Sequence, residues 1–124
     1  GGADCISAIN TLRGLGVDIK YIGNKFIKKM IQGGLSGSCI KPVALYMVNQ
    51  IKNAVKIPVI AMGGICKLSD LFEFILAGAD AFQIGTANFQ TPSICTSLAL
   101  ELCEFMEKNN FYDFETLKGA ILNG

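Results

Sequence analysis

Residues 58–64 read PVIAMGG and residues 81–86 read AFQIGT, and these two stretches decide the fold. Each is a short apolar run that ends at glycine, which is typical of a buried strand entering a tight turn. The apolar residues between them repeat with helical spacing: Leu68, Leu71, Phe72, Ile75 and Leu76. Gly78 then marks the expected end of that helix. The order strand, helix, strand predicts a parallel sheet with right-handed crossovers.

The alternation of strands and helices continues on both sides of residues 58–86. Before it, residues 5–9 form an apolar run that stops at Asn10-Thr11 and predicts another strand. Residues 41–55 predict a helix, because their apolar residues have helical spacing and Pro42 suits the first turn. Two further helices are expected, one from the Thr91-Pro92 cap to about Asn109 and one from Asp113 to about Leu122.

Residues 12–38 are expected to form a long, glycine-punctuated loop. Within it, residues 17–21 and 25–30 alternate in polarity on either side of Gly23-Asn24, which predicts a small hairpin. Loops of this length inside compact domains are usually functional or disordered. We therefore expect this segment to lie near the site.

Two architectures fit alternating strands and helices, the closed eight-stranded barrel and the open doubly wound sheet. The barrel is favoured because Gly63-Gly64 and Gly85-Thr86 follow the last two strands, where barrels of this class bind phosphate. A nucleotide-binding open sheet would more often carry Gly-x-Gly-x-x-Gly after its first strand, and this fingerprint is missing. A barrel needs about 250 residues. Residues 1–124 are therefore interpreted as one α/β unit with parallel strands, the carboxyl-terminal portion of a TIM (β/α)8 barrel, and as a fragment.

Composition argues against several classes of function. Eleven basic and ten acidic residues are spread along the chain and give a net charge of +1, so we expect neither nucleic acid nor a membrane surface as a partner. Five cysteines without a Cys-x-x-Cys pair suggest no disulfide framework and no metal site, and predict small buried thiols in a reducing, cytoplasmic protein. Histidine is absent, which removes the commonest general base.

Three glycine-bearing segments suggest a site made of backbone amides: residues 33–37, Gly63-Gly64 and Gly85-Thr86. Glycine lets the chain approach an anion closely, and a helix that begins nearby adds its positive end. Simple tight turns or a helix cap would produce the same residues, so the pattern alone leaves those readings open. Lys41 is interpreted as a solvated surface lysine.

A resemblance to a known protein family adds information on function that composition and spacing do not give. Residues 9–12 (INTL), 33–45 (GGLSGSCIKPVAL), 62–65 (MGGI) and 85–89 (GTANF) occur in an order that resembles the carboxyl-terminal part of dihydroorotate dehydrogenases. Within that family the pattern is most similar to the catalytic subunit of the NAD-linked class 1B enzymes. The resemblance covers nearly the whole chain, although Ser38-Cys39 and Ala61 replace the residues usual in the family.

The resemblance implies FMN as cofactor and assigns site residues. Positions that match FMN contacts are Ile9, Gly37, Gly63, Gly64, Gly85 and Thr86, and those that match substrate contacts are Asn10 and Thr11. It further implies oxidation of dihydroorotate to orotate in the biosynthesis of UMP, and a homodimer that works with an iron-sulfur and FAD subunit. The family's cysteine base lies on an earlier strand, so no catalytic residue and no metal ligand is assigned here, and this piece alone is expected to be inactive.

Two alternatives stay open. The chain could belong to a flavin barrel like that of dihydropyrimidine dehydrogenase, which shares the Asn-Thr pair, although Ile9 and the GTANF run of residues 85–89 argue against it. It could also be a non-catalytic half-barrel that binds a phosphorylated ligand.

Overall fold

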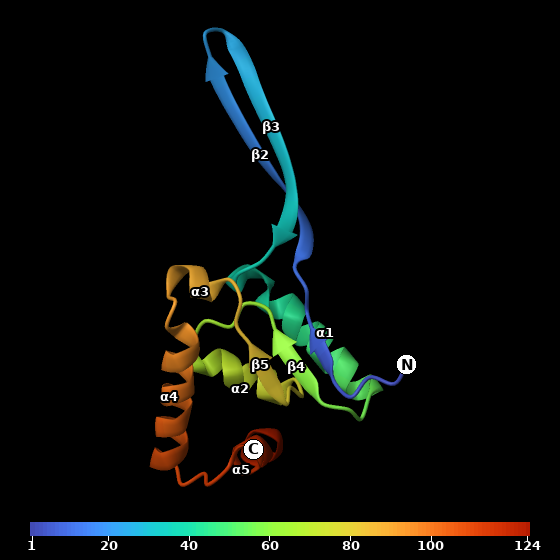
Figure 1. Ribbon diagram of the computed structural model, residues 1–124, viewed down its shortest axis with the longest axis vertical. Coiled ribbons are helices and arrows are strands. Elements are labelled where there is room, and N and C mark those ends of the chain that lie inside the picture. The colour runs from blue at the N-terminus through green and yellow to red at the C-terminus, as the bar shows by residue number, and fades with distance from the viewer.

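The computed structural model describes residues 1–124 and shows a compact body from which a long two-stranded ribbon projects (Figure 1). The body holds a parallel sheet of β1 (Ile6–Ala8), β4 (Val59–Met62) and β5 (Ala81–Gln83), in the order β1-β4-β5. The ribbon pairs β2 (Leu12–Ile22) with β3 (Lys25–Leu35) in antiparallel register. A 3-10 turn (Ser38–Ile40) precedes the helices, which are α1 (Lys41–Ala54), α2 (Leu68–Leu76), α3 (Ala87–Gln90), α4 (Ile94–Lys108) and α5 (Phe114–Asn123).

Strand register gives the sheet two different faces. Ala8, Ala61 and Phe82 are aligned in one row and point toward the helices. Successive residues of a strand point to opposite faces, so Ser7, Ile60 and Ala81 form a row on the other face. Ser7 and Ala81 are exposed and Ile60 is half-buried. The sheet therefore has one packed face and one open face, and its outer strands β1 and β5 each pair on one side only.

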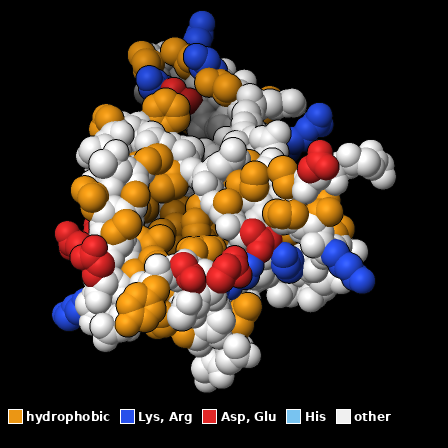
Figure 2. Space-filling model, turned by 60° about the horizontal axis from the view of Figure 1, so that its bottom comes forward, with side chains coloured by type: hydrophobic (Ala, Val, Ile, Leu, Met, Phe, Trp, Pro, Cys, Tyr) orange, Lys and Arg blue, Asp and Glu red, His pale blue; other side chains and the backbone are white.

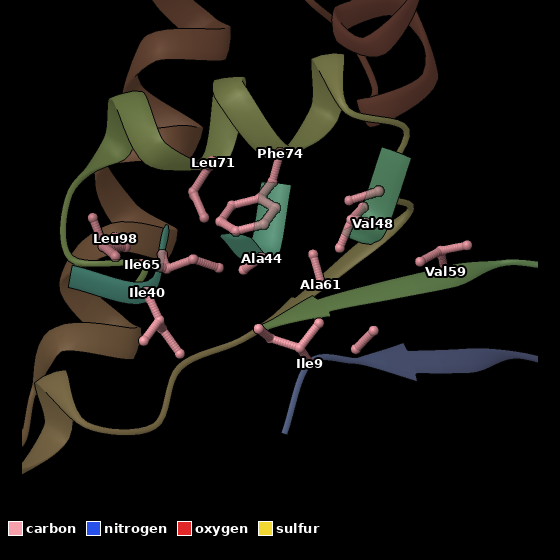
Figure 3. Close-up of a cluster of buried hydrophobic side chains, with 12 residues drawn as sticks. Ile9, Ile40, Ala44, Val48, Val59, Ala61, Ile65, Leu71, Phe74 and Leu98 are labelled. Atoms are coloured by element: carbon pink, nitrogen blue, oxygen red, sulfur yellow. The ribbon is translucent and has the colours of Figure 1, made fainter. Parts of the chain in front are cut away.

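The core lies between the packed face of the sheet and the helices α1 and α2 (Figure 3). Phe74 of α2 has no exposed surface, and Ala44 and Val48 of α1 lie beside it. Twelve buried residues make up the cluster: Ala8, Ile9, Ile40, Ala44, Val48, Val59, Ala61, Ile65, Leu71, Phe74, Ala79 and Leu98. Burying the valine, leucine, isoleucine and phenylalanine side chains of this cluster stabilises the fold by about 1.5–3 kcal/mol each. The core thus fixes the strands whose ends form the site.

Asp80 ties three elements together beside this core. Its Oδ2 accepts hydrogen bonds from the Val59 backbone N–H at 2.8 Å and from Lys52 Nζ of α1 at 2.8 Å, and its Oδ1 pairs with Lys118 Nζ of α5. Burial alone would raise the pKa of Asp80, but these donors outweigh it and lower the pKa to about 2. The carboxylate therefore stays charged and holds α1, β4 and α5 in place.

Much of the predicted organisation is confirmed. The strands are parallel, the helices lie where the spacing predicted them, and Gly78, at φ 104°, follows α2 in the left-handed conformation that favours glycine. Asp113 caps α5 by accepting from the Thr116 N–H at 2.7 Å. The closed barrel stays a prediction, because it requires strands beyond these three.

The hairpin predicted around Gly23-Asn24 is confirmed but is longer than expected: an antiparallel ladder joins Leu12 through Ile22 to Lys25 through Leu35 and takes up nearly all of the predicted loop. One expectation was wrong. All five cysteines are exposed rather than buried: Cys5, Cys39, Cys66, Cys95 and Cys103. They lie in turns, at the amino-terminal segment or on the outer side of α4, where the chain places no other element over them.

Part of the apolar surface of the body remains uncovered. Viewed toward its lower end, the body has a broad hollow in which hydrophobic side chains gather (Figure 2). Leu76 and Leu100 are each more than half exposed. No helix combines the length and the apolar character that a bilayer-spanning segment requires.

We predict that Asp80→Asn lowers the free energy of unfolding near neutral pH by about 2 kcal/mol. The pKa of Asp80 is about 2 in the folded state against 3.8 ordinarily, so the stabilisation is present above pH 3.8 and is lost as the pH falls toward 2. Denaturant titrations of the natural protein that carries this chain, at neutral pH and at the acid end, measure both effects.

The matched control for this change is Asp18→Asn on the ribbon. Asp18 pairs with Lys20 at 3.6 Å, but both side chains are more than half exposed. Exposed pairs contribute little, so this variant should unfold like the unmodified protein. Equal stability losses in the two variants would contradict the role given to Asp80.

Candidate functional site

A cavity of about 190 Å³ lies at the carboxyl ends of the parallel strands. All eight residues predicted as site residues line it: Ile9, Asn10, Thr11, Gly37, Gly63, Gly64, Gly85 and Thr86. Its lining contains no acidic and no basic side chain. The cavity is thus built from backbone and neutral side chains.

The fold explains why residues so far apart in the sequence meet here. β1, β4 and β5 are parallel, so their carboxyl ends lie at one edge of the sheet. Residues 9–11 follow β1, Gly63-Gly64 follow β4, and Gly85-Thr86 come two residues after the end of β5. Gly37 reaches the same edge because β3 of the ribbon returns the chain beside β2. Each strand end therefore contributes one wall.

Gly64 brings two loops into backbone contact. Its φ of 80° lies in the left-handed region. A Cβ atom at Gly64 would lie 3.0 Å from the Gly37 carbonyl oxygen and 3.0 Å from the Lys41 nitrogen, closer than side chains normally pack. Glycine is therefore required both by the dihedral angle and by the approach of the neighbouring backbone.

Backbone donors are available at this cavity. The main-chain N–H groups of Gly63, Gly64, Gly85 and Thr86 donate to no acceptor within the chain. Unpaired N–H groups around a small neutral cavity fit a ligand with several acceptor oxygens, such as a phosphate. The chemistry that this arrangement supports is the binding of an anion by backbone amides.

The segment that leads from Gly63-Gly64 into α2 is bound by a side chain of the chain itself. Asp70, at the third position of α2, accepts hydrogen bonds from the N–H groups of Cys66 at 2.8 Å and Lys67 at 3.1 Å. The N–H groups of Cys66 and Lys67, immediately before α2, are therefore already paired with a carboxylate of the chain. Backbone amides of the glycine loops remain as the donors for a ligand.

Asn10 is oriented by its neighbour. Its Oδ1 accepts from the Thr11 backbone N–H at 2.7 Å. This contact directs the carbonyl side of the amide to the chain's own backbone and leaves the Nδ2 donors without a partner in the chain. Asn10 and Thr11 are both exposed and line the cavity, and the Thr11 hydroxyl lies between Asn10 Oδ1, 3.5 Å away, and the backbone of Gly34.

Lys41 was wrongly interpreted as a solvated surface residue. Its Nζ forms ion pairs with Asp70 at 2.7 Å and Glu73 at 2.8 Å, and only 21% of its side chain is exposed. The hydrogen bonds that the Lys41 ammonium donates to both carboxylates raise the pKa of Lys41. Burial opposes ionisation of Asp70, but the hydrogen bonds from Lys41, Cys66 and Lys67 hold its pKa below the usual value.

Asp70 is a residue that sequence reasoning missed. It is 2% exposed, and it links the start of α1, through Lys41, to the turn that follows Gly63-Gly64. The available signal was an acidic residue in the first turn of a predicted helix, which is a common capping position. No local sequence pattern predicts its ion pair with Lys41, because the two residues are 29 positions apart.

Two of the predicted glycines lie elsewhere. Gly33 and Gly34 are inside β3, paired with Gly14 and Arg13, and not at the cavity. They line a separate, wider hollow of about 580 Å³ at the base of the ribbon. Thr11 lines both hollows, so the cavity and the base of the ribbon adjoin.

Comparison with known proteins agrees with the family resemblance of the sequence. A family model described as dihydroorotate dehydrogenase matches residues 1–106. Relatives named dihydroorotate dehydrogenase B (NAD(+)), catalytic subunit, are 47% identical over 121 residues in Geotalea uraniireducens, 47% over 119 in Geobacter metallireducens and 46% over 120 in Parabacteroides distasonis. These alignments cover 96–98% of this chain, and the chain spans 38–39% of the length of those relatives.

We predict that Lys41→Met lowers the free energy of unfolding by about 3 kcal/mol, because it leaves the buried Asp70 carboxylate without its cation. The double variant Lys41→Met with Asp70→Asn should lose less than the sum of the single variants, since the uncompensated charge is then removed. Denaturant unfolding of the four proteins measures this coupling. Strictly additive losses would contradict this coupling.

Glu73→Gln is the control, because Glu73 is the more exposed partner of Lys41. This variant should lower the free energy of unfolding by less than about 1 kcal/mol.

Proposed function

The chain belongs to the dihydroorotate dehydrogenase family, and we propose that it takes part in the FMN-dependent oxidation of dihydroorotate to orotate during pyrimidine biosynthesis. One observation carries this proposal: a single cavity gathers the ends of all three parallel strands together with Gly37 from the return of the ribbon. In this proposal the chain supplies the phosphate seat of FMN and part of the substrate site.

The cavity suits the phosphate end of FMN on chemical grounds. A phosphate monoester is a dianion with several acceptor oxygens, and it is bound well by converging backbone N–H groups. Gly63, Gly64, Gly85 and Thr86 offer such groups, and no carboxylate lines the cavity to repel the anion. A volume of about 190 Å³ holds a phosphate rather than a complete flavin. Ile9 and Gly37 would then contact the cofactor beside the phosphate.

Asn10 and Thr11 suit a ring with amide and carboxylate groups. The Nδ2 of Asn10 is left as a donor by the contact between Oδ1 and the Thr11 N–H, and carbonyl and carboxylate oxygens of dihydroorotate are matching acceptors. The Thr11 hydroxyl adds a donor that also accepts. We therefore assign these two residues to orientation of the substrate.

The chemical step needs groups that these residues do not provide. FMN, when bound, supplies an acceptor for the hydride that the oxidation releases. The cavity lining offers no histidine, lysine or carboxylate that could take the accompanying proton. The Cys66 thiol also lines the cavity, but the family resemblance implies a base on an earlier strand, so we assign the proton acceptor to a part of the enzyme outside residues 1–124 and binding and orientation to this chain.

Residues 1–124 are proposed to be the last part of a TIM (β/α)8 barrel. The row Ser7, Ile60 and Ala81 on the open face of the sheet would then point into the barrel, and the free edges of β1 and β5 would pair with further strands. An isolated piece of this kind exposes strand edges and apolar surface, so we expect it to be inactive alone.

The relatives are named as catalytic subunits, which supports a multisubunit enzyme. We propose a homodimer that passes electrons to NAD through a second subunit carrying an iron-sulfur cluster and FAD. We also propose a cytoplasmic location. Five cysteines that form no disulfide suit a reducing compartment.

We predict that Gly85→Asp weakens FMN binding by at least about 100-fold, because a carboxylate beside the phosphate replaces attraction by repulsion. Gly85 is the most suitable position for this test, because a side chain there should not disturb the fold. A Cβ at Gly85 has no atom within 4 Å, and its φ is not in the left-handed region. At Gly64 the same change would also strain the fold. Titration of the apoprotein with FMN, followed by flavin fluorescence, measures the affinity.

Riboflavin, which lacks the phosphate, separates the proposed site from any other flavin site. The unmodified protein should prefer FMN to riboflavin, and Gly85→Asp should abolish that preference. Gly119→Asp is the control, because Gly119 lies in α5 away from the cavity and also has no atom within 4 Å of its Cβ position. An unchanged preference in Gly85→Asp would refute the phosphate seat, whereas FMN binding without oxidation of dihydroorotate would leave a non-catalytic binding protein.

A further inference from the structure

Gly34 lies in β3 at the base of the ribbon, where the ribbon joins the body (Figure 1). It pairs with Arg13 inside a regular antiparallel ladder, and its φ is not in the left-handed region. Neither a turn nor an unusual dihedral angle therefore requires glycine at this position. Glycine inside a strand weakens the strand, and it often marks a place where other atoms approach the backbone closely.

The atoms that approach Gly34 are those of the Thr11 side chain. A Cβ atom at residue 34 would overlap Thr11 Oγ1, and it would lie 2.6 Å from Thr11 Cβ and 3.2 Å from Thr11 Cγ2. All three heavy atoms of the threonine side chain therefore occupy space that any other residue at position 34 would need.

Rotation of the Thr11 side chain cannot relieve this overlap. Rotation about χ1 moves Oγ1 and Cγ2, but the backbone fixes the position of Cβ. An alanine at residue 34 would therefore have to push the two backbones apart, since its Cβ must move from 2.6 Å to 3.4 Å from Thr11 Cβ to reach ordinary contact. The Leu12–Leu35 pair lies directly beside this point and opposes separation of the two strands.

The backbone of Thr11 also orients Asn10. The Thr11 N–H donates to Asn10 Oδ1 at 2.7 Å, and Thr11 Oγ1 lies 3.5 Å from the same oxygen. A displacement of Thr11 therefore changes the direction of the Asn10 amide as well as the place of the threonine hydroxyl. Both of these residues line the cavity, whereas Gly34 does not.

We propose that Gly34 is a positioning residue for the substrate, because its missing side chain determines where Thr11 and, through it, Asn10 lie at the cavity. This inference rests on the proposed function, in which Asn10 and Thr11 orient dihydroorotate. Gly34 acts through Thr11 and contacts neither substrate nor cofactor. The phosphate seat at the ends of β4 and β5 shares no residue with this contact. A change at Gly34 should therefore affect the substrate and leave FMN binding intact.

Gly33 provides the matched control. It is the neighbouring residue of β3, it pairs with Gly14, and its φ is also outside the left-handed region. A Cβ atom at Gly33 would have no atom within 4 Å. Gly33→Ala and Gly34→Ala therefore make the same chemical change one residue apart in one strand, and only the second change reaches Thr11.

The test measures substrate and cofactor binding in the natural protein that carries this chain. Equilibrium dialysis with labelled orotate gives the affinity for the product, and steady-state kinetics with dihydroorotate give kcat/KM. Gly34→Ala should lower both by about 10- to 100-fold, because a misplacement of about 1 Å has effects of this size. Its affinity for FMN, from titration of the apoprotein, should equal that of the unmodified protein. Gly33→Ala should match the unmodified protein in all three measurements.

A double variant separates positioning from a general loss of structure. Thr11→Gly removes every side-chain atom that an alanine at residue 34 would overlap. Alone, this change should weaken orotate binding, because the threonine hydroxyl is lost. Gly34→Ala should then cause no further loss of orotate affinity when it is added to Thr11→Gly, since the two residues act through one contact.

Four results would overturn the inference and leave the proposed function in place. These are equal orotate affinity in Gly34→Ala and the unmodified protein, equal losses in the two alanine variants, an additive loss in the double variant, and a loss of folding or of FMN in Gly34→Ala that Thr11→Gly does not reverse. An unmodified protein that binds FMN but no orotate would overturn the proposed function together with this inference.

Discussion

The contact between the Gly63-Gly64 turn and the segment from Gly37 to Lys41 is the constraint on which the site depends. β4 and β1 fix the turn at one edge of the sheet, and α1 fixes Lys41, so the two backbones can meet only if residue 64 has no side chain. The N–H groups of Gly63 and Gly64 donate to no acceptor within the chain. The turn that this contact fixes therefore also carries the donors proposed for the ligand.

Two carboxylates hold the surrounding elements at the distances that this contact needs. Asp70 joins the start of α1 to the start of α2, and Asp80 joins the other end of α1 to β4 and α5. Both bind backbone N–H groups as well as lysines, so each fixes a loop and a helix together. Both carboxylates are paired with lysines and lie outside the cavity lining, which contains no acidic group that would repel an anion.

The sequence was sufficient for features that depend on local order. Helical spacing, glycine after a strand and the Gly23-Asn24 turn each follow from a few adjacent residues, and the eight site residues follow from the order of the strands together with a family pattern. Features that depend on long-range partners were missed. The ion pair of Lys41 with Asp70 joins residues 29 apart, and exposure of the cysteines depends on which elements lie above them.

The base of the ribbon belongs to the site, and the rest of its length does not. The site needs only the base of the ribbon, where the Leu12–Leu35 pair keeps Thr11 near Ser36 and Gly37. Gly34, in the next row, leaves space for the Thr11 side chain. The further rows of paired residues add nothing to the cavity, and they expose apolar side chains that cost stability in water. Thr11, which lines both hollows, joins the base of the ribbon to the cavity.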